Sequence, residues 1–439
     1  MQILIFLLLV LIFIVVATAT FKLHPFFSLL IASVFLGFTA KMEGILIISK
    51  ITEGFGNTLS SIGIIIAFGT VIGVFLEKSR ATQVLADGIL NIIGIKRSPL
   101  AMNMTGFIVS IPVFCDSGFV ILSALNKALS KKSGIPLAVL AISLSAGLYA
   151  THVFIPPTPG PLAAAAALDA DIGLVILLGI VVAIASSLSG FFWAKYIGRK
   201  IEVKVEDLPE EETRIENMPG IISALAPILI PILFIALKSI AQLPSSPFGE
   251  GIFFNFSIFI GHPVIALFIG VLLSFNLLKG SKDLRFSWVS SGLKEAGIII
   301  LITGAGGALG NIIRAAGIGE IIGSYFSEQH MGIFLPFIIA AILKTAQGSS
   351  TVAIITTAAI IAPMLDPLGL SAPAGKALGV LAIGAGAMTV SHLNDSYFWV
   401  VSQFSGMDVQ NALKGQTVAT FIQGFTGIIA IYILSLFIM

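Results

Sequence analysis

Residues 172–194 read IGLVILLGIVVAIASSLSGFFWA, a stretch without a single charged side chain. A helix that crosses a bilayer needs about 20 mainly apolar residues, so this stretch predicts a membrane span. The whole chain has the same character, since 57% of its 439 residues are hydrophobic and only 10% are charged. Soluble domains carry about 25% charged residues. The composition therefore excludes a soluble enzyme, a nucleic-acid binder and a disordered chain, and it indicates a polytopic membrane protein.

Similar apolar runs lie on both sides of this stretch. In lipid every backbone polar group must be satisfied within the segment, so the spans are expected to be helices. We expect an all-α polytopic membrane protein with about 12 full spans. The runs cover residues 3–20, 25–40, 61–76, 99–114, 137–150, 172–194, 221–237, 254–278, 297–313, 332–343, 378–390 and 418–439. Shorter apolar pieces at 119–129, 153–168, 352–364 and 397–404 predict re-entrant hairpins and broken helices. The first run lacks a basic region before it, so it predicts a retained helix rather than a signal peptide.

The charges of the loops predict the orientation. The linker 201–219 and the loop 279–294 carry clustered basic residues, whereas the loop 241–253 has none. Loops rich in Lys and Arg face the cytoplasm, which places the linker inside and both termini outside in the cell inner (plasma) membrane. A net charge of +2 indicates no polyanionic partner, and the single Cys115 excludes an intramolecular disulfide.

The two halves of the chain resemble each other at a spacing of about 238 residues. The matching pieces are His24-Pro25 with His262-Pro263, Gly69-x-x-x-Gly73 with Gly306-x-x-x-Gly310, and 149–152 with 389–392. Together with the orientation, this predicts two inverted transmembrane repeats, 1–200 and 220–439, joined by the cytoplasmic linker 201–219. Inverted repeats are common in secondary transporters, although a duplicated channel or scaffold is an alternative.

A first pair of polar interruptions falls at matching places in the two halves. Residues 111–119 read IPVFCDSGF, and residues 343–351 read LKTAQGSST. Such tips free backbone amides that can hold an anion. Asp116 is a carboxylate inside an apolar run and by default suggests a coupling site, with a helix cap as the alternative. Lys344 could pair with a substrate carboxylate, or extend its side chain to the membrane interface.

A second pair of interruptions lies at residues 155–161, IPPTPGP, and 391–396, SHLNDS. Prolines at this density cannot continue a helix, so the first stretch exposes carbonyl groups and presents Thr158. His392 and Asp395 would share a helix face, and a histidine beside an acid is a plausible proton carrier. A hydrogen-bonded structural cluster is the alternative. Two ligands are too few for a metal site, and we expect no metal or cofactor. The glycine-rich run 303–310 lacks the rest of a phosphate loop and is better explained by close helix packing.

At these positions the sequence resembles the gluconate permease family, the gluconate:proton symporters. The pieces that carry the resemblance are IPVF at 111–114 with the following acid and GFV at 118–120, PPTPGP at 156–161, ITGAGG at 302–307, AQGSSTVA at 346–353, and SHLNDS at 391–396 with Trp399. The resemblance implies an inner-membrane secondary carrier that imports small hydroxylated acids with protons. Known members take gluconate, related sugar acids, glycerate or D-serine. The family pattern usually has glutamate in place of Asp116 and commonly arginine in place of Lys344.

These observations lead to the expectation of a proton-coupled symporter, not an enzyme, for a small hydroxylated organic acid such as gluconate or a related sugar acid. Its partners would be this acid, protons and the lipid bilayer, and a homo-oligomer is left open. The expected substrate-binding residues are Ser117, Gly118, Thr158, Lys344, Gln347, Ser349, Ser350, Thr351 and Asn394, and the expected proton-coupling residues are Asp116, His152, His392 and Asp395. The alternatives are a sodium-coupled carboxylate carrier, a glycerate- or D-serine-type substrate, an intramembrane hydrolase using Ser349 or Ser350 with His392, and a passive channel.

Overall fold

The fold was analysed in a computed structural model of the chain. The structure describes residues 9–10, 12–14, 16–17, 20–203, 218–242, 248–278, 282–317, 332–393 and 395–439. Most of the first apolar run, residues 204–217 of the linker and Asn394 lie outside the described residues, and so does the side chain of Gln347.

The described residues form helices and no strands, which confirms the all-α prediction. The first half contains α2 (Pro25–Thr39), α3 (Gly44–Lys78), α4 (Ala81–Ile93), α5 (Ser98–Val109), α6 (Cys115–Ser133), α7 (Leu137–Phe154), α8 (Pro159–Ala167) and α9 (Ile172–Ile197). The second half contains α10 (Ile221–Ala241), α11 (Ile252–Ile260), α12 (Pro263–Ser274), α13 (Lys282–Ala315), α15 (Phe334–Gln347), α16 (Ser350–Ile361), α17 (Pro373–Met388), α18 (Ser396–Ser405), α19 (Val409–Ala412) and α20 (Val418–Ile438).

Fewer helices are long enough to span a membrane than the sequence suggests. Within the described residues, 5 helical stretches are long and apolar enough to cross, or up to 7 if two bent pairs each count as one span. The number of about 12 full spans is therefore not confirmed. Several of the expected runs are shorter apolar helices, among them α2, α15, α16 and α17. Such short helices meet at breaks, as the interrupted sequence pattern predicts.

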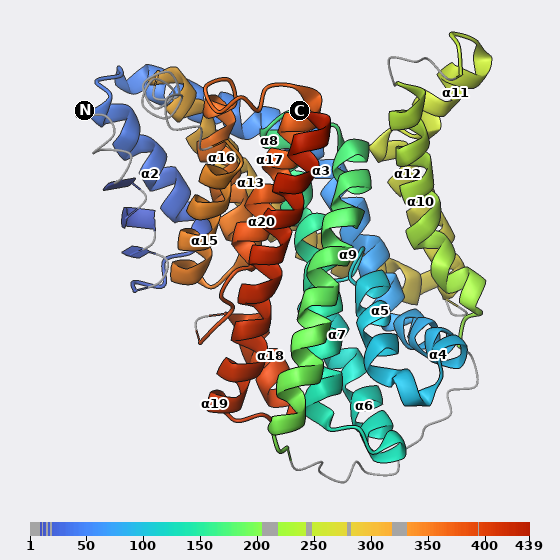
Figure 1. The fold of residues 1–439 in the computed structure, drawn as a ribbon. Coiled ribbons are helices and arrows are strands. Elements are labelled where there is room, and N and C mark those ends of the chain that lie inside the picture. The colour runs from blue at the N-terminus through green and yellow to red at the C-terminus, as the bar shows by residue number, and fades with distance from the viewer. Residues whose placement is uncertain are drawn as a thin grey trace.

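The long helices α3 and α13 pack along each other and support the rest of the bundle. Helix α2 packs on α13, and α12 packs on α3. Figure 1 shows α2 on one flank of the molecule and α10 to α12 on the other, with α7, α9 and α20 between them. The end of α20 lies on the opposite face from the connection between α9 and α10.

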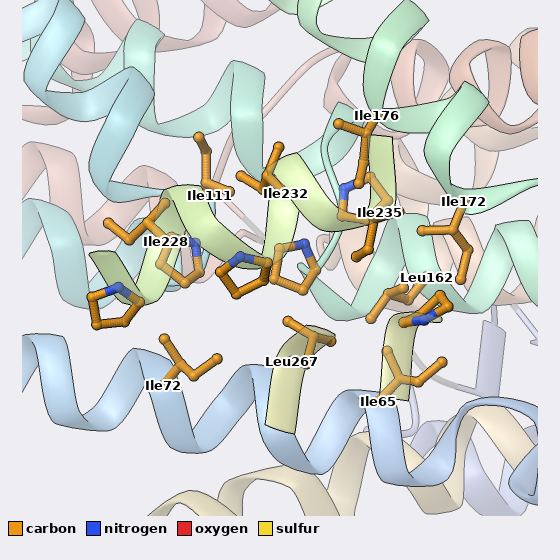
Figure 2. Close-up of a pocket in the computed structure, with 16 residues that line it drawn as sticks. Ile65, Ile72, Ile111, Leu162, Ile172, Ile176, Ile228, Ile232, Ile235 and Leu267 are labelled. Carbon is orange, nitrogen blue, oxygen red and sulfur yellow. The ribbon is translucent and has the colours of Figure 1, made fainter. Parts of the chain in front are cut away.

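An apolar seam separates α10 and α12 from the interrupted segments of the first half. A small enclosed cavity of about 10 Å³ marks it, and every one of its lining residues is isoleucine, leucine or proline. Figure 2 shows these side chains converging from α3, α9, α10 and α12. The lining residues are Ile65, Ile72, Ile111, Pro112, Pro156, Pro157, Leu162, Ile172, Ile176, Pro227, Ile228, Pro231, Ile232, Ile235, Pro263 and Leu267. We call this set the apolar seam.

Glycine at position 106 permits the close approach of α5 and α7. A Cβ atom there would lie 2.5 Å from the carbonyl oxygen of Leu144 and 2.8 Å from the amide nitrogen of Leu148. Both are backbone atoms that cannot rotate away. The two helices must therefore separate if the position carries a side chain.

We expect Gly106→Ala to destabilise the protein by about 1–3 kcal/mol, the usual cost of overpacking, seen as a lower thermal midpoint in detergent. Gly56→Ala is the matched control, because a Cβ atom at this helical glycine meets nothing within 4 Å. It should leave the midpoint unchanged or raise it, since alanine favours helix by about 1 kcal/mol over glycine. Equal midpoints for the two variants would contradict the close approach.

Candidate functional site

Four interruptions of the helical chain meet in the interior. They are the turn between α5 and α6, the break between α7 and α8, the tip between α15 and α16, and the break between α17 and α18. Helix α16 packs on α8, and α18 packs on α6. The sequence breaks at these points because proline and glycine cannot continue the helices, so polar backbone is present inside an apolar bundle. Irregular backbone at membrane depth is tolerated where protein buries it or where it lines a wet cavity.

A buried ion pair joins two of the four interruptions. Lys344 Nζ lies 2.5 Å from Asp395 Oδ2, and the lysine side chain is fully buried. The ammonium group also donates a hydrogen bond of 2.7 Å to the carbonyl oxygen of Gly348. The carboxylate accepts further hydrogen bonds from the hydroxyl of Ser391 and, at 3.1 Å, from the amide of Tyr397. Lys344 is thus held inside the site by a carboxylate, which removes the alternative that its side chain extends to the membrane interface.

Asp116 lies in the first turn of α6, close to the same pair. The hydroxyl of Ser396 donates to Asp116 Oδ1 at 3.3 Å, and the thiol of Cys115 lies 3.6 Å from Oδ2. Ser396 follows Asp395 directly in the chain, so Asp116 and Asp395 lie on either side of one serine. The structure therefore places two predicted coupling carboxylates in one cluster.

Aromatic side chains form one wall of this cluster. The ring of Tyr149 stacks on the ring of His152 with centroids 6.4 Å apart, and its face lies 5.9 Å from Lys344 Nζ. Phe114 contacts the other part of the histidine at 5.9 Å between centroids. His152 is 4% exposed, and its Nδ1 has no hydrogen-bond partner among the described residues. A buried nitrogen without a partner is costly, so it is available to a ligand.

Two helices begin at the cluster with capped amides. Asp395 caps α18 through Tyr397, and Ser349 caps α16 by accepting from the amide of Val352 at 3.3 Å. Helices α6 and α8 also begin here, but neither has a side-chain cap. Helix N-termini carry a partial positive charge that favours anions. The arrangement suits a bound carboxylate.

Other predicted residues lie nearby with local partners. Thr158 is buried, and its hydroxyl donates to the carbonyl oxygen of Ile155 at 2.6 Å. His392 Nε2 lies 2.9 Å from the carbonyl oxygen of Thr345. Ser350 lies beside the hydroxyl of Tyr149. These contacts connect the second break to the α15–α16 tip.

Ser117 and Gly118 point to different neighbours. Ser117 lies beside the carboxylate of Glu77 on α3. A Cβ atom at Gly118 would lie 2.8 Å from Leu148 Cδ2, so this glycine serves close packing of α6 against α7. Thr351 is half-buried on the first turn of α16.

Sequence reasoning missed four residues that the structure places in or beside the cluster. They are Glu77, Tyr149, Ser391 and Tyr397, and the last of these packs on Tyr149 with centroids 5.1 Å apart. Glu77 ends an apolar run, and this position was the available signal for it. Tyr149 and Tyr397 read as ordinary apolar helix positions, so no signal distinguished them. Within the described part of the chain no three His, Cys, Asp or Glu residues could hold a metal ion.

A helical bundle with broken helices around a buried charged cluster defines a membrane transport protein. Two solved structures share the fold. The YdaH transporter of Alcanivorax borkumensis matches with a TM-score of 0.61 at 14% identity over 94% of this chain and 99% of that one. MtrF of Neisseria gonorrhoeae, described as illuminating a class of antimetabolite efflux pumps, matches with a TM-score of 0.67 at 16% identity over 95% and 96%.

Sequence comparison identifies the family. The family model described as GntP family permease matches residues 1–437, and the chain belongs to this family. A gluconate permease of Pseudomonas aeruginosa is 35% identical over 96% of this chain and 95% of its own length. The D-serine transporter DsdX of Escherichia coli is 32% identical over 98% of both chains, and an uncharacterized permease of Haemophilus influenzae is 36% identical over 97% and 90%. These relatives are permeases and transporters rather than enzymes, as the sequence predicted.

Proposed function

We propose that this protein is a proton-coupled carrier that imports a small hydroxylated carboxylate such as gluconate or a related sugar acid. The observation that carries the proposal is the Lys344–Asp395 pair, buried where the four interruptions meet. The names of the relatives, gluconate permease and D-serine transporter, support a small carboxylate as substrate. A sodium-coupled carrier and a glycerate- or D-serine-type substrate remain the alternatives to be tested.

The buried pair provides a reason why a proton and an anion would move together. An unpaired charge in an apolar interior is strongly unfavourable. A substrate carboxylate can therefore take the place of Asp395 on Lys344 only if Asp395 is neutralised at the same time. One proton on Asp395 and one anion on Lys344 leave the net charge of the cluster unchanged. Asp116, separated from Asp395 by Ser396, is the proposed group through which the proton passes.

The hydroxyls and amides around the pair would bind the rest of the substrate. Ser349, Ser350, Thr351 and Asn394 lie on the tip or the second break, and Thr158 lies on the proline break. The neutral Nδ1 of His152, which has no partner among described residues, would accept or donate a hydrogen bond to a substrate hydroxyl. Gln347, Ser117 and Gly118 belong to the same two tips and complete the proposed set.

The helix contacts support the proposal of two inverted repeats. Helices α2, α3, α5, α7, α8 and α9 have α12, α13, α15, α17, α18 and α20 at matching places, with Pro25 and Pro263 as the first residues of α2 and α12. The contacts match as well, because α2 packs on α13 as α12 packs on α3, and α8 packs on α16 as α18 packs on α6. In Figure 1, α9 and its counterpart α20 run in opposite directions.

This symmetry supports the remaining parts of the proposal. The repeats would comprise residues 1–200 and 220–439 with the linker 201–219 in the cytoplasm and both termini outside. About 12 crossings would result if the paired short helices each enter the membrane from one side. Transport would alternate the access of the cluster by moving one part of the repeat pair against the rest.

Uptake into proteoliposomes tests the proposal. With an inside-alkaline pH gradient, labelled gluconate should accumulate above its external concentration, and a proton uncoupler should abolish the accumulation. Competition by other sugar acids, glycerate, lactate and D-serine then orders the substrates. Accumulation that needs Na⁺ and ignores the uncoupler would favour the sodium alternative, and flux without accumulation would indicate a channel.

A further inference from the structure

A polar cavity lies beside the candidate site, between α3, α8, α13 and α16. Its volume is about 270 Å³, and both polar and apolar groups line it. Ligand pockets usually measure about 300–1,000 Å³, so the space suits a small solute. The sequence had assigned the glycine-rich run 303–310 to helix packing alone. In the structure Gly306, Gly307 and Gly310 of this run line the cavity.

A second cavity of about 480 Å³ continues the first toward the C-terminal ends of α8, α13 and α16. The two cavities share Ala167, Arg314 and Ala362 in their linings. In Figure 1, α8 and α16 are labelled on the face where the chain ends, opposite the α9–α10 connection. The inner cavity reaches Ala163, about one helical turn (~5.4 Å) beyond Pro159 at the start of α8. The two cavities thus lead from one face toward the four interruptions.

Arg314 is the unpaired cation of this path within the described residues. It lines both cavities and is exposed, and no hydrogen bond or ion pair is found for its guanidinium among described residues. The other lysine of the outer cavity, Lys376, is paired with Asp169 at 2.7 Å. Glu53, the acid nearest to Arg314, is paired with Lys50 at 2.8 Å. A free guanidinium fork is well suited to a carboxylate.

The remaining polar groups of the inner cavity are of one kind. They are the hydroxyls and amides of Asn57, Thr58, Ser61, Thr303 and Asn311, without any acidic side chain. Such groups bind hydroxyls, and one cation binds one carboxylate. We propose that this cavity is an outer binding site for a small hydroxylated monocarboxylate, held at Arg314 before it passes to the Lys344–Asp395 cluster. The inference rests on the proposed function for the direction of movement.

Removal of the arginine charge tests the site by kinetics. Arg314→Gln should raise KM for gluconate uptake about 10-fold at low ionic strength, with kcat unchanged, and Arg314→Lys should restore most of the loss. Arg285→Gln is the matched control, since it removes the same charge from the other end of α13. The difference between the variants should shrink at high salt, because salt screens exposed charges. An unchanged KM in Arg314→Gln would overturn the proposal.

Labelling tests occupancy of the site without transport. The protein has one native cysteine, Cys115, which is 2% exposed, so the background with a membrane-impermeant maleimide should be low. Ala166→Cys lines the inner cavity and should react, and gluconate should protect it. Ala164→Cys, on the same helix but fully buried, should not react. Labelling of Ala166→Cys that gluconate does not slow would overturn the site.

The two experiments separate the failure of this inference from that of the proposed function. If wild-type protein accumulates gluconate while Arg314→Gln and Ala166→Cys show no effect, only the outer site is wrong. If gluconate protects Ala166→Cys in detergent but drives no accumulation in proteoliposomes, the outer site stands and proton-coupled uptake is wrong.

Discussion

Asp395→Asn is expected to abolish gluconate accumulation and to lower the thermal midpoint of the protein. The substitution leaves the ammonium of Lys344 fully buried without its carboxylate partner. Breaking one side of a buried pair typically costs about 3–5 kcal/mol. Asparagine also carries no proton, so the proposed exchange of a proton for an anion cannot occur. Uptake in proteoliposomes and thermal unfolding in detergent measure the two effects.

A double variant separates the loss of stability from the loss of coupling. Lys344→Gln with Asp395→Asn removes both charges, and it should recover most of the thermal midpoint but none of the accumulation. The control for stability is Asp169→Asn, which breaks an exposed Lys–Asp pair whose carboxylate is 94% exposed. Exposed pairs contribute about 0–1 kcal/mol, so this midpoint should hardly change. A stable, fully accumulating Asp395→Asn variant would exclude the pair from the mechanism.

Asp116→Asn should abolish accumulation driven by a pH gradient while the protein still inserts and folds. The amide keeps the shape of the carboxylate and can still accept from the hydroxyl of Ser396. It cannot take up a proton, however, and the group proposed to pass protons to Asp395 is lost. The concentration ratio across the membrane should therefore fall to about one, since only coupling can drive it higher. Exchange of internal for external gluconate without a gradient should continue.

The matched control is Asp87→Asn, which changes an exposed acid on α4 in the same half of the chain. It should accumulate gluconate like the wild type. Full accumulation by Asp116→Asn would remove this residue from the coupling role. Loss of exchange together with accumulation would show that Asp116 acts in substrate binding instead.

The sequence predicted the breaks better than the helices. Pro156, Pro157, Gly348 and Asp395 each mark an interruption that the structure contains, because proline, glycine and capping residues act locally on the backbone. The helix lengths were less predictable. Helix α3 begins at Gly44, although the apolar run begins at residue 61, because charges such as Lys50 and Glu53 hide the helical continuity. The same effect hid the start of α13.

The partners within the site could not be read from the chain. Lys344 and Asp395 are separated by 51 residues, and nothing in either local sequence indicates that the two breaks meet. Lys344 was therefore assigned to a substrate carboxylate, whereas the structure gives it a carboxylate of the protein itself. Such pairings follow from the packing of α15 on α17 and of α18 on α6, which only the three-dimensional structure defines.

The apolar seam between α10, α12 and the two breaks has a consequence for movement. No side chain in its lining carries a hydrogen-bonding group, and the six prolines also lack an amide donor. One surface can therefore slide over the other without breaking a directional bond. Dispersion contacts re-form at nearly any offset, because each atom pair contributes only about 0.1–0.2 kcal/mol. A seam of this kind imposes little friction and no preferred stopping point, so any discrete resting position must be set by the polar cluster on its far side.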